Sequence, residues 1–273
     1  ETLCLWAAGM SMFDALNHAF SIAATGGFST RNLSVAYYNS DLINCIFLFF
    51  MAICAMHFGL IYAVFVTRSL KPLKNSVVKY YFGSIAVMSL VIMFSLMAKG
   101  GYESFGDALM DSCFTVVSYM STAGFAICDN STWPWLAGVV LLLASFQCGC
   151  AGSTTGGIKV DRIIIAFKAV SNEIRHRLHP TSVSHARLSG QHLADDTVSA
   201  VLMYIVIYFI VIFAHDGSCR IFIFRIYRCS CRNSRKCACF NDYFLVIYCC
   251  ICDCRLYIPS VVSATIIFLP FCC

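Results

Sequence analysis

The sequence predicts an all-α, polytopic membrane protein built of repeated units, each a helix, a re-entrant loop and a second helix. Of its 273 residues, 59% are hydrophobic and only 12% are charged, about half the charged share of soluble domains. Apolar runs long enough to cross a bilayer recur along the chain. A five-residue stretch also returns in nearly the same form, as TGGFS at 25–29 and TAGFA at 122–126.

The first half of the chain predicts two spans and two half-helices. Residues 13–24 and 105–120 are apolar but too short and too polar for lipid-facing spans, so each is expected to form a half-helix that leads into one of the loops. Residues 41–66 and 80–98 are continuous apolar runs and are expected to cross the membrane. Between these spans, residues 67–79 carry several basic side chains, which predicts a connection on the cytoplasmic side.

The second half begins with an apolar run that is interrupted. Residues 135–147 are too short to cross the membrane comfortably, the run breaks at 148–157 (CGCAGSTTGG), and it resumes over 158–170. A basic stretch follows, and residues 197–214 are expected to form the last full span.

The distribution of basic residues predicts the orientation of these segments. They collect at 67–79 and 159–187, whereas 29–40 holds one and 126–134 holds none. By the positive-inside rule, the two basic segments are cytoplasmic and both loops open to the outside. The expected organisation is a unit lacking its first helix (1–66), a cytoplasmic linker (67–79), a complete unit with a broken last helix (80–170), a basic cytoplasmic linker (171–196), the first helix of a further unit (197–214) and a Cys-rich tail (215–273).

The two loops predict backbone ligands for an ion. Non-helical backbone inside hydrocarbon is tolerated only where protein buries it or water lines it, and glycine lets carbonyl groups turn without a side-chain penalty. Neutral carbonyl oxygens suit a hard monovalent cation. The alternative is a pair of ordinary turns between helices, which the recurrence in register disfavours. The candidate ion-coordinating residues are Thr25, Gly26, Gly27, Phe28, Thr122, Ala123, Gly124 and Phe125.

The break at 148–157 predicts a flexible or pore-facing plug, because four glycines and three hydroxyl side chains interrupt an apolar run at mid-membrane. The alternative is a static kink whose freed backbone groups are satisfied by Ser and Thr. A nucleotide-binding P-loop is excluded, since Ile158 occupies the lysine position and no strand precedes the glycines. The candidate gating residues are Gly149, Gly152, Ser153, Thr154, Thr155, Gly156, Gly157 and Lys159.

Other polar residues in the apolar segments have ordinary structural interpretations. His18 and His57 are expected to be packed and hydrogen-bonded, because neither has metal-ligand partners at suitable spacing. Asp14 and Asp111 are expected to stabilise the N-terminal ends of the half-helices. We expect no enzyme activity, no catalytic residues, no cofactor and no bound metal beyond a transported ion. The net charge of +5 is not interpreted as nucleic-acid binding in so apolar a chain.

Three stretches carry a resemblance to a known family: residues 21–30 (SIAATGGFST), 121–126 (STAGFA) and 148–160 (CGCAGSTTGGIKV). They resemble the Trk/Ktr/HKT superfamily of potassium transporters, in particular the membrane subunit of bacterial Trk systems. The resemblance covers roughly residues 1–214, and the third stretch is highly specific. It implies units of the potassium-channel type around one pore, with the two loops as the second and third filter segments. The broken helix would be an intramembrane loop that obstructs the pore below them.

The resemblance also implies a function and partners. We expect channel-like transport of potassium ions across the cytoplasmic (inner) membrane, through a filter of backbone carbonyls gated by the intramembrane loop. The expected partners are the lipid bilayer, a second copy in a homodimer, and a cytosolic nucleotide-binding regulatory subunit. The competing class is a secondary transporter that binds a solute between discontinuous helices. It would need paired discontinuous helices in inverted or parallel repeats, whereas these loops repeat in the same orientation.

The last segment departs from the family pattern. Residues 215–273 hold eleven of the eighteen cysteines, show no helical pattern over 216–240 and deliver no further Gly-rich loop. We expect a frameshift near 214–216; the alternative is a divergent tail with apolar, membrane-associated pieces. A third class, a cysteine-based metal-binding protein, rests wholly on this tail, whose CxC spacings do not fit a structural zinc site. Since Glu1 is not a natural initiator, the chain is expected to be an incomplete product of a longer protein.

Overall fold

The computed structural model describes residues 1–178 except 70 and 103, together with 187–188, 191–192 and 195–230. The chain divides into two compact units, Glu1–Ile205 and Val206–Cys273, each of which is described by itself. Over the described residues the structure is helical apart from one short strand pair. The all-α class predicted from the sequence is therefore confirmed.

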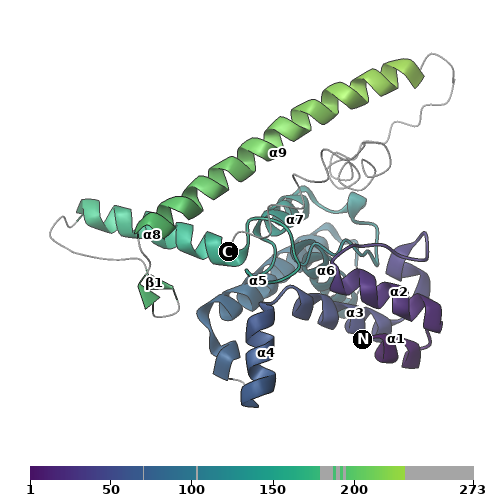
Figure 1. Ribbon diagram of the computed structural model, residues 1–273. Helices are drawn as coiled ribbons and strands as arrows, with labels where there is room; N and C mark the ends of the chain where they lie inside the picture. The colour runs from purple at the N-terminus through teal and green to yellow at the C-terminus, as the bar shows by residue number, and fades with distance from the viewer. Residues whose placement is uncertain (70, 103, 179–186, 189–190, 193–194, 231–273) are drawn as a thin grey trace, which may run out of the picture. The chain divides into compact units, whose positions relative to one another are not determined.

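The first loop lies among short helices (Figure 1). Up to residue 67 the elements are α1 (Thr2–Ala7), α2 (Met12–Ala23), the 3₁₀ turn η1 (Ser34–Tyr38), α3 (Asp41–Cys54) and α4 (Phe58–Thr67). Helix α2 begins after Ser11, whose hydroxyl accepts a hydrogen bond from the N–H of Asp14 at 3.1 Å. This cap satisfies one of the free amides of the first turn.

The second loop follows a longer helical hairpin. Its elements are η2 (Lys71–Lys74), α5 (Ser76–Lys99), α6 (Phe105–Met120), η3 (Asn130–Thr132), α7 (Trp135–Gln147) and α8 (Val160–Leu178). Asn75 caps the start of α5 by accepting from Val77 N, and Gly100, with φ +73°, ends it. Helices α6 and α7 have the bounds predicted from the sequence.

The last described elements are a two-residue strand pair, β1 (Arg187–Leu188) with β2 (Gln191–His192), and helix α9 (Asp195–Ser230). The strands are antiparallel and too short to change the fold class. The expectation of no helical pattern over 216–240 is wrong for 216–230, which continue α9. Residues 231–273, with most of the predicted Cys-rich tail, lie outside the described residues.

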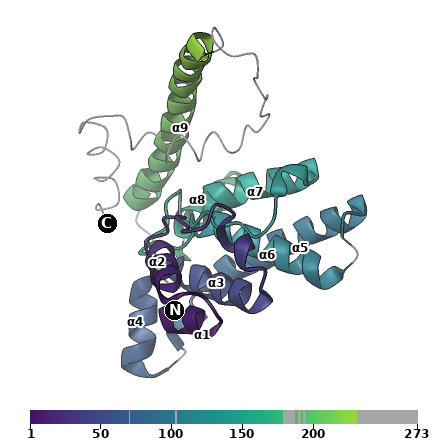
Figure 2. The ribbon, with the colours of Figure 1, turned by 90° about the vertical axis from the view of Figure 1, so that its right-hand side faces the viewer.

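The core of the first unit lies where α5 packs against α6 and α7 and where α3 meets α6. Helices α3, α5 and α6 lie side by side in both views (Figures 1 and 2). Its largest fully buried side chains include Phe47, Tyr81, Phe114 and Met120. The packing of α6 against α5 and α3, and of α2 against α1 and α3, positions the two helices from which the loops emerge.

Residues 41–66, predicted as one continuous span, form two helices, α3 and α4, bent by 96°. His57 starts the second helix, because its Nδ1 accepts a hydrogen bond from Gly59 N at 2.9 Å. The carbonyl of Ala55 is occupied by Cys150 N at 2.9 Å instead of by its own helix. A helix bends sharply where its hydrogen-bond ladder is interrupted in this way.

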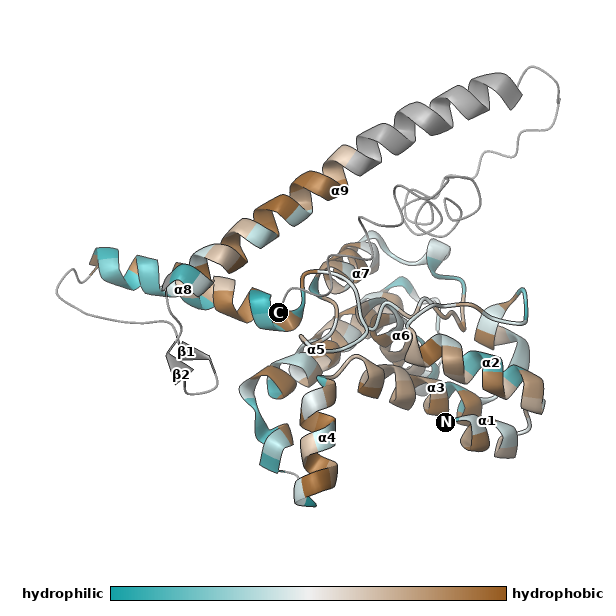
Figure 3. Cartoon of the chain, viewed as in Figure 1, coloured by the Kyte–Doolittle hydropathy of each residue, from teal (hydrophilic) through white to brown (hydrophobic). Residues whose placement is uncertain are grey.

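Two of the described helices are long and apolar enough to cross a membrane: α5 and the Asp196–Ala214 part of α9. The bent pair α3–α4 passes the same test when its two helices are taken together. Figure 3 shows hydrophobic residues along much of α4 and the first part of α9, whereas α8 carries many hydrophilic ones. The helices thus fit a protein that crosses the membrane several times.

Candidate functional site

The two loops repeat one backbone conformation at corresponding positions. Thr25 and Thr122 both have positive φ, +49° and +54°, and Gly27 and Gly124 follow at +71° and +74°. In each loop the threonine N–H donates to the carbonyl three residues earlier, at 3.0 Å and 3.1 Å. A non-glycine residue in the left-handed region costs about 1–2 kcal/mol. The fold must therefore hold both loops in this conformation.

The first amide groups of each loop are occupied, whereas the carbonyl groups of 25–27 and 122–124 are not; the carbonyl of Phe125 accepts from Ser118 Oγ at 2.7 Å. The N–H groups of Thr25, Gly26, Thr122 and Ala123 all donate back to the last turns of α2 and α6. Among the described residues, nothing donates a hydrogen bond to the carbonyl oxygens of 25–27 or of 122–124. Carbonyl groups away from water normally have partners, so these oxygens are available to a ligand.

The two loops lie directly against each other. A Cβ atom built on Gly27 would come within 2.3 Å of the carbonyl oxygen of Ala123, so only glycine fits at this position. The last residue of each candidate set is a phenylalanine, and the two differ in exposure: Phe28 is exposed and Phe125 is buried. The structure therefore brings the two predicted backbone sets together, with the Phe28 ring turned outward.

The interruption between α7 and α8, residues 148–159, is a compact loop with its two ends tied together. We call it the interrupted segment. Cys148 and Lys159, which bound it, both have positive φ, +54° and +77°. Val160 N donates to the carbonyl of Gly149 at 3.0 Å, which holds the start of α8 beside the start of the segment.

Lys159 turns back over the interrupted segment. Its Nζ donates to the carbonyl oxygen of Ser153 at 3.2 Å and also to the carbonyl oxygen of Thr155. The carboxylate of Asp161 accepts a hydrogen bond from Ala151 N at 2.6 Å. Hydrogen bonds that involve a charged group contribute about 1.5–3 kcal/mol each. These side chains therefore stabilise one conformation of the segment.

The interrupted segment touches both loops at corresponding positions. Thr25 Oγ1 shares its hydrogen between the carbonyl of Ala24, at 2.8 Å, and the carbonyl of Thr154, at 3.2 Å. Thr122 Oγ1 accepts from the N–H of Gly156, also at 3.2 Å. Since the two threonines hold the same place in the repeat, the segment reaches from one loop to the other. The candidate gating residues thus adjoin the candidate ion-coordinating residues.

The interrupted segment also packs into the bend between α3 and α4. Phe58 N donates to the carbonyl of Gly152 at 3.1 Å, and Cys150 N donates to the carbonyl of Ala55. A Cβ atom built on Gly152 would lie 3.0 Å from Nε2 of His57. Sequence reasoning missed this contact. The offset that relates the two loops also pairs Ala55 with Gly152, so a break in both second helices was the available signal.

The acidic residues expected at the starts of the half-helices have other partners. The carboxylate of Asp14, in the first turn of α2, accepts from Thr30 Oγ1 at 2.6 Å and from Arg31 at 3.0 Å. The Thr30 hydroxyl is the largest cause that lowers the pKa of Asp14 from 3.8 to about 2, and hydrogen bonds with Ser11, Tyr38 and Arg31 add to it. Asp111 lies in the middle of α6 and accepts from the Tyr102 hydroxyl at 2.6 Å. The predicted helix-end role is therefore wrong for Asp111.

Both histidines are packed and hydrogen-bonded, as predicted. His18 is fully buried, with Nδ1 2.7 Å from the carbonyl of Asp14 and Nε2 2.8 Å from Oγ of Ser29. His57 caps α4. Within the part of the chain that the structure describes, no three His, Cys, Asp or Glu side chains gather where they could hold a metal ion.

Sequence comparison relates the chain to cation transport proteins. Residues 3–218 match the family model TrkH, described as a cation transport protein. The Trk system potassium uptake protein TrkH of Salmonella typhimurium is 37% identical over 200 residues, which cover 73% of this chain and 41% of that protein. The Trk system potassium uptake protein TrkG of Escherichia coli is 34% identical over 207 residues, covering 76% of this chain and 42% of that protein.

A solved structure agrees with these sequence matches. The crystal structure of the potassium transporter TrkH from Vibrio parahaemolyticus matches with a TM-score of 0.74 and 35% identity, over 78% of this chain and 46% of that one. The chain spans about two fifths of the length of the curated relatives it matches. Because the family model covers residues 3–218 of the 273, the chain belongs to the TrkH family of cation transport proteins.

Proposed function

We propose that this chain forms part of a channel-like pathway for potassium ions across the membrane. Similar proteins are named potassium uptake proteins, and the two loops offer neutral oxygen ligands. Backbone carbonyls can replace the hydration shell of a monovalent cation without adding charge to the pathway. The loops at 25–28 and 122–125 would then act as two segments of an ion filter.

One observation carries this proposal: in both loops the first amides are bound, and the carbonyls of 25–27 and 122–124 are open, whereas that of Phe125 accepts from Ser118 Oγ. The N–H groups of Thr25 and Thr122 return to their own half-helices, while the carbonyls of 25–27 and 122–124 accept nothing from the described residues. Any helix end leaves its last carbonyls without intrahelical partners; here this arrangement recurs at corresponding positions of two loops that lie against each other. A cation is the ligand that a set of acceptors without donors favours.

The interrupted segment is proposed as the gate. It contacts the threonine of each loop, through Thr154 and Gly156, and Lys159 holds it in place. Glycines at 149, 152, 156 and 157 make a second backbone arrangement accessible. Movement of the segment away from the threonines would open the path on that side of the loops.

The proposed setting follows the relatives. The protein would lie in the cytoplasmic (inner) membrane as a multi-pass, non-enzymatic transporter, assemble as a homodimer, and bind a cytosolic nucleotide-binding regulatory subunit. Potassium would be its cargo, with no resident cofactor. The frameshift near 214–216 stays a proposal, which the gene sequence after codon 214 would test. If neither alternative frame encodes a half-helix and a Gly-rich loop, the frameshift is ruled out.

A secondary solute transporter is the weaker alternative. It requires paired discontinuous helices, and the α3–α4 bend provides a second broken helix beside α7–α8. The family, however, is one of cation transport proteins. Both breaks also contact each other through backbone groups, which leaves those groups occupied.

The proposal is tested in a chimera in which residues 3–218 replace the matching part of the Salmonella relative. Expressed in cells that lack other potassium uptake, the chimera is expected to take up rubidium, with inhibition by potassium and none by organic solutes. Gly124→Ser, which places a side chain at φ +74° inside the second loop, should reduce the preference for potassium over sodium.

Gly100→Ser is the matched control. Gly100 has nearly the same φ, +73°, but nothing lies within 4 Å of a Cβ built there. The control should keep the ion preference of the unmodified chimera. Unchanged discrimination in Gly124→Ser would remove the second loop from the filter, and inhibition by an organic solute would favour the alternative.

A further inference from the structure

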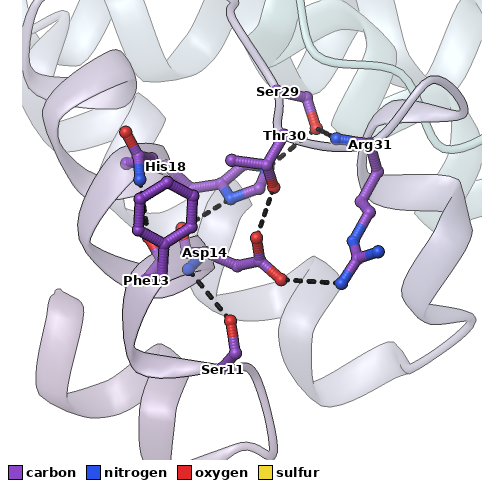
Figure 4. A network of polar contacts seen from close by, with 8 residues as sticks. Ser11, Phe13, Asp14, His18, Ser29, Thr30 and Arg31 are labelled. Carbon is purple, nitrogen blue, oxygen red and sulfur yellow. Dashed lines mark hydrogen bonds and ion pairs between the residues drawn. The ribbon is translucent and has the colours of Figure 1, made fainter.

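A chain of hydrogen bonds runs behind the first loop, from α2 to the residues that follow the candidate filter (Figure 4). His18 lies between the carbonyl of Asp14 and the hydroxyl of Ser29, at 2.7 Å and 2.8 Å. The Ser29 hydroxyl also accepts from Arg31 N at 3.1 Å, and the Asp14 carboxylate binds Thr30 and Arg31. Two residues one turn apart on α2 thus hold the whole stretch 29–31.

The contacts assign the tautomer of His18. A backbone carbonyl only accepts, so Nδ1 must carry the proton that it donates to Asp14. In the neutral ring, Nε2 is then an acceptor, and Ser29 must donate its hydroxyl hydrogen to it. The same hydroxyl oxygen accepts from Arg31 N. Each hydrogen bond that joins residues 29–31 to α2 therefore has its donor on the loop side.

The His18 ring also lies between the two loops. Its centroid is 5.9 Å from that of Phe125, in the second loop, and 5.5 Å from that of Phe47, on α3. The ring is fully buried, so it has no freedom to move without disturbing these neighbours. One side chain therefore contacts both loops, one through a hydrogen bond and the other through a tilted ring contact.

We infer that His18 is a positioning residue that holds the first loop in place relative to the second through its hydrogen bond to Ser29, and thereby determines ion specificity. The specificity part rests on the proposed function. The corresponding positions of the second repeat are Thr115 and Ala126, which cannot form this pair. This side-chain hydrogen bond is therefore specific to the first loop.

Two substitutions of His18 separate the hydrogen bond from the ring. In His18→Asn, the amide nitrogen occupies the place of Nδ1 and keeps the bond to Asp14, as Asn17 does with Phe13 at 2.8 Å, but it does not reach Ser29. In His18→Gln, the longer side chain places its amide oxygen near the position of Nε2. Both variants lose the ring; His18→Asn keeps the bond to Asp14 and His18→Gln keeps the bond to Ser29, so faster exchange in His18→Asn than in His18→Gln reports the bond to Ser29.

The first measurement is amide hydrogen exchange on the purified full chain in detergent, which needs no ion transport. Loss of one hydrogen bond of about 1 kcal/mol should raise exchange at residues 29–31 about fivefold in His18→Asn and in Ser29→Ala. His18→Gln should stay near the wild type. The double variant His18→Asn/Ser29→Ala should equal Ser29→Ala, because the bond to His18 is already absent there, whereas Ser29→Ala also frees the Arg31 N–H. Residues 160–170 of α8 serve as the internal reference.

Ser145→Ala is the matched control for Ser29→Ala, since Ser145 bonds only a carbonyl of its own helix, Leu142, at 2.8 Å. It should leave exchange at 29–31 unchanged. Equal exchange in His18→Asn and His18→Gln, or no change in Ser29→Ala, would overturn the positioning role even if a variant at position 18 folded poorly.

The second measurement is potassium-over-sodium discrimination in the chimera described above. His18→Asn and Ser29→Ala should lower it, and His18→Gln should restore it. Equal discrimination in all three would overturn the specificity role. A chimera that transports no potassium would refute the proposed function instead, and the exchange rates would still decide whether His18 positions the loop.

Discussion

The close approach of the two loops predicts that Gly27→Ala destabilises the folded protein. The added Cβ would meet the carbonyl oxygen of Ala123 at 2.3 Å, more than 1 Å short of the 3.4–4 Å of ordinary contact. The obstacle is backbone, which cannot rotate away as a side chain does. The φ of +71° adds a second cost, because a β-carbon is disfavoured there.

The size of the effect follows from these two terms. The left-handed conformation costs alanine about 1–2 kcal/mol, and overpacking of a filled site costs about 1–3 kcal/mol more. Gly27→Ala should therefore lower the free energy of unfolding by about 2–5 kcal/mol. Gly100→Ala, with φ +73° and nothing within 4 Å, should lose only the conformational part.

The assay is equilibrium unfolding of the purified chain in detergent, followed for the wild type and both variants under one set of conditions. Exchange of loop amides at 122–126 is measured in parallel, because the clash pushes on the second loop. Equal destabilisation by the two substitutions, with no change at 122–126, would refute the close approach of the loops.

Two further predictions concern the segment behind the loops and the network beside them. Lys159→Met removes the hydrogen bonds from Nζ to Ser153 and Thr155, so the chimera with this substitution should take up rubidium faster than the unmodified chimera. Lys74→Met, at an exposed lysine, is the control. Slower or equal uptake in Lys159→Met would contradict the gating role. Asp14→Asn tests the depressed pKa of Asp14, which is about 2 instead of 3.8. Because this pKa is lowered in the folded state, the ionised carboxylate stabilises the fold at pH values above 3.8, and this stabilisation is lost as the pH falls toward 2. The thermal stability gap between wild type and Asp14→Asn should be full at pH 6 and shrink below about pH 4, whereas a gap independent of pH would contradict the network.

The elements that sequence reasoning placed correctly are those with strong local signals. Helix α7 follows Pro134, where a helix can begin, and ends where the glycines start. The loops were found because glycine and a short half-helix recur together. In each case the signal lies within the element itself, which is why α6 and α7 have the predicted bounds.

The features that were missed depend on contacts that the pattern within one element does not show. The run 41–66 is apolar throughout, and hydropathy cannot distinguish a straight span from a bent one. The bend at Ala55 depends on the hydrogen bond from Cys150 N to the Ala55 carbonyl, and Cys150 is distant in sequence. Asp111 was assigned to a helix start, although its partner Tyr102 precedes the helix. The bond between His18 and Ser29 needs the loop conformation before it can be seen.

The central claim is that the open carbonyls of 25–27 and 122–124 bind a potassium-like ion. An experimental structure of the chimera in rubidium, with the ion located by its anomalous scattering, tests this claim most directly. We predict rubidium density within coordination distance of carbonyl oxygens from both loops, reduced at the second loop in Gly124→Ser. Density confined to side-chain oxygens elsewhere, or none at the loops in a chimera that still transports rubidium, would contradict it.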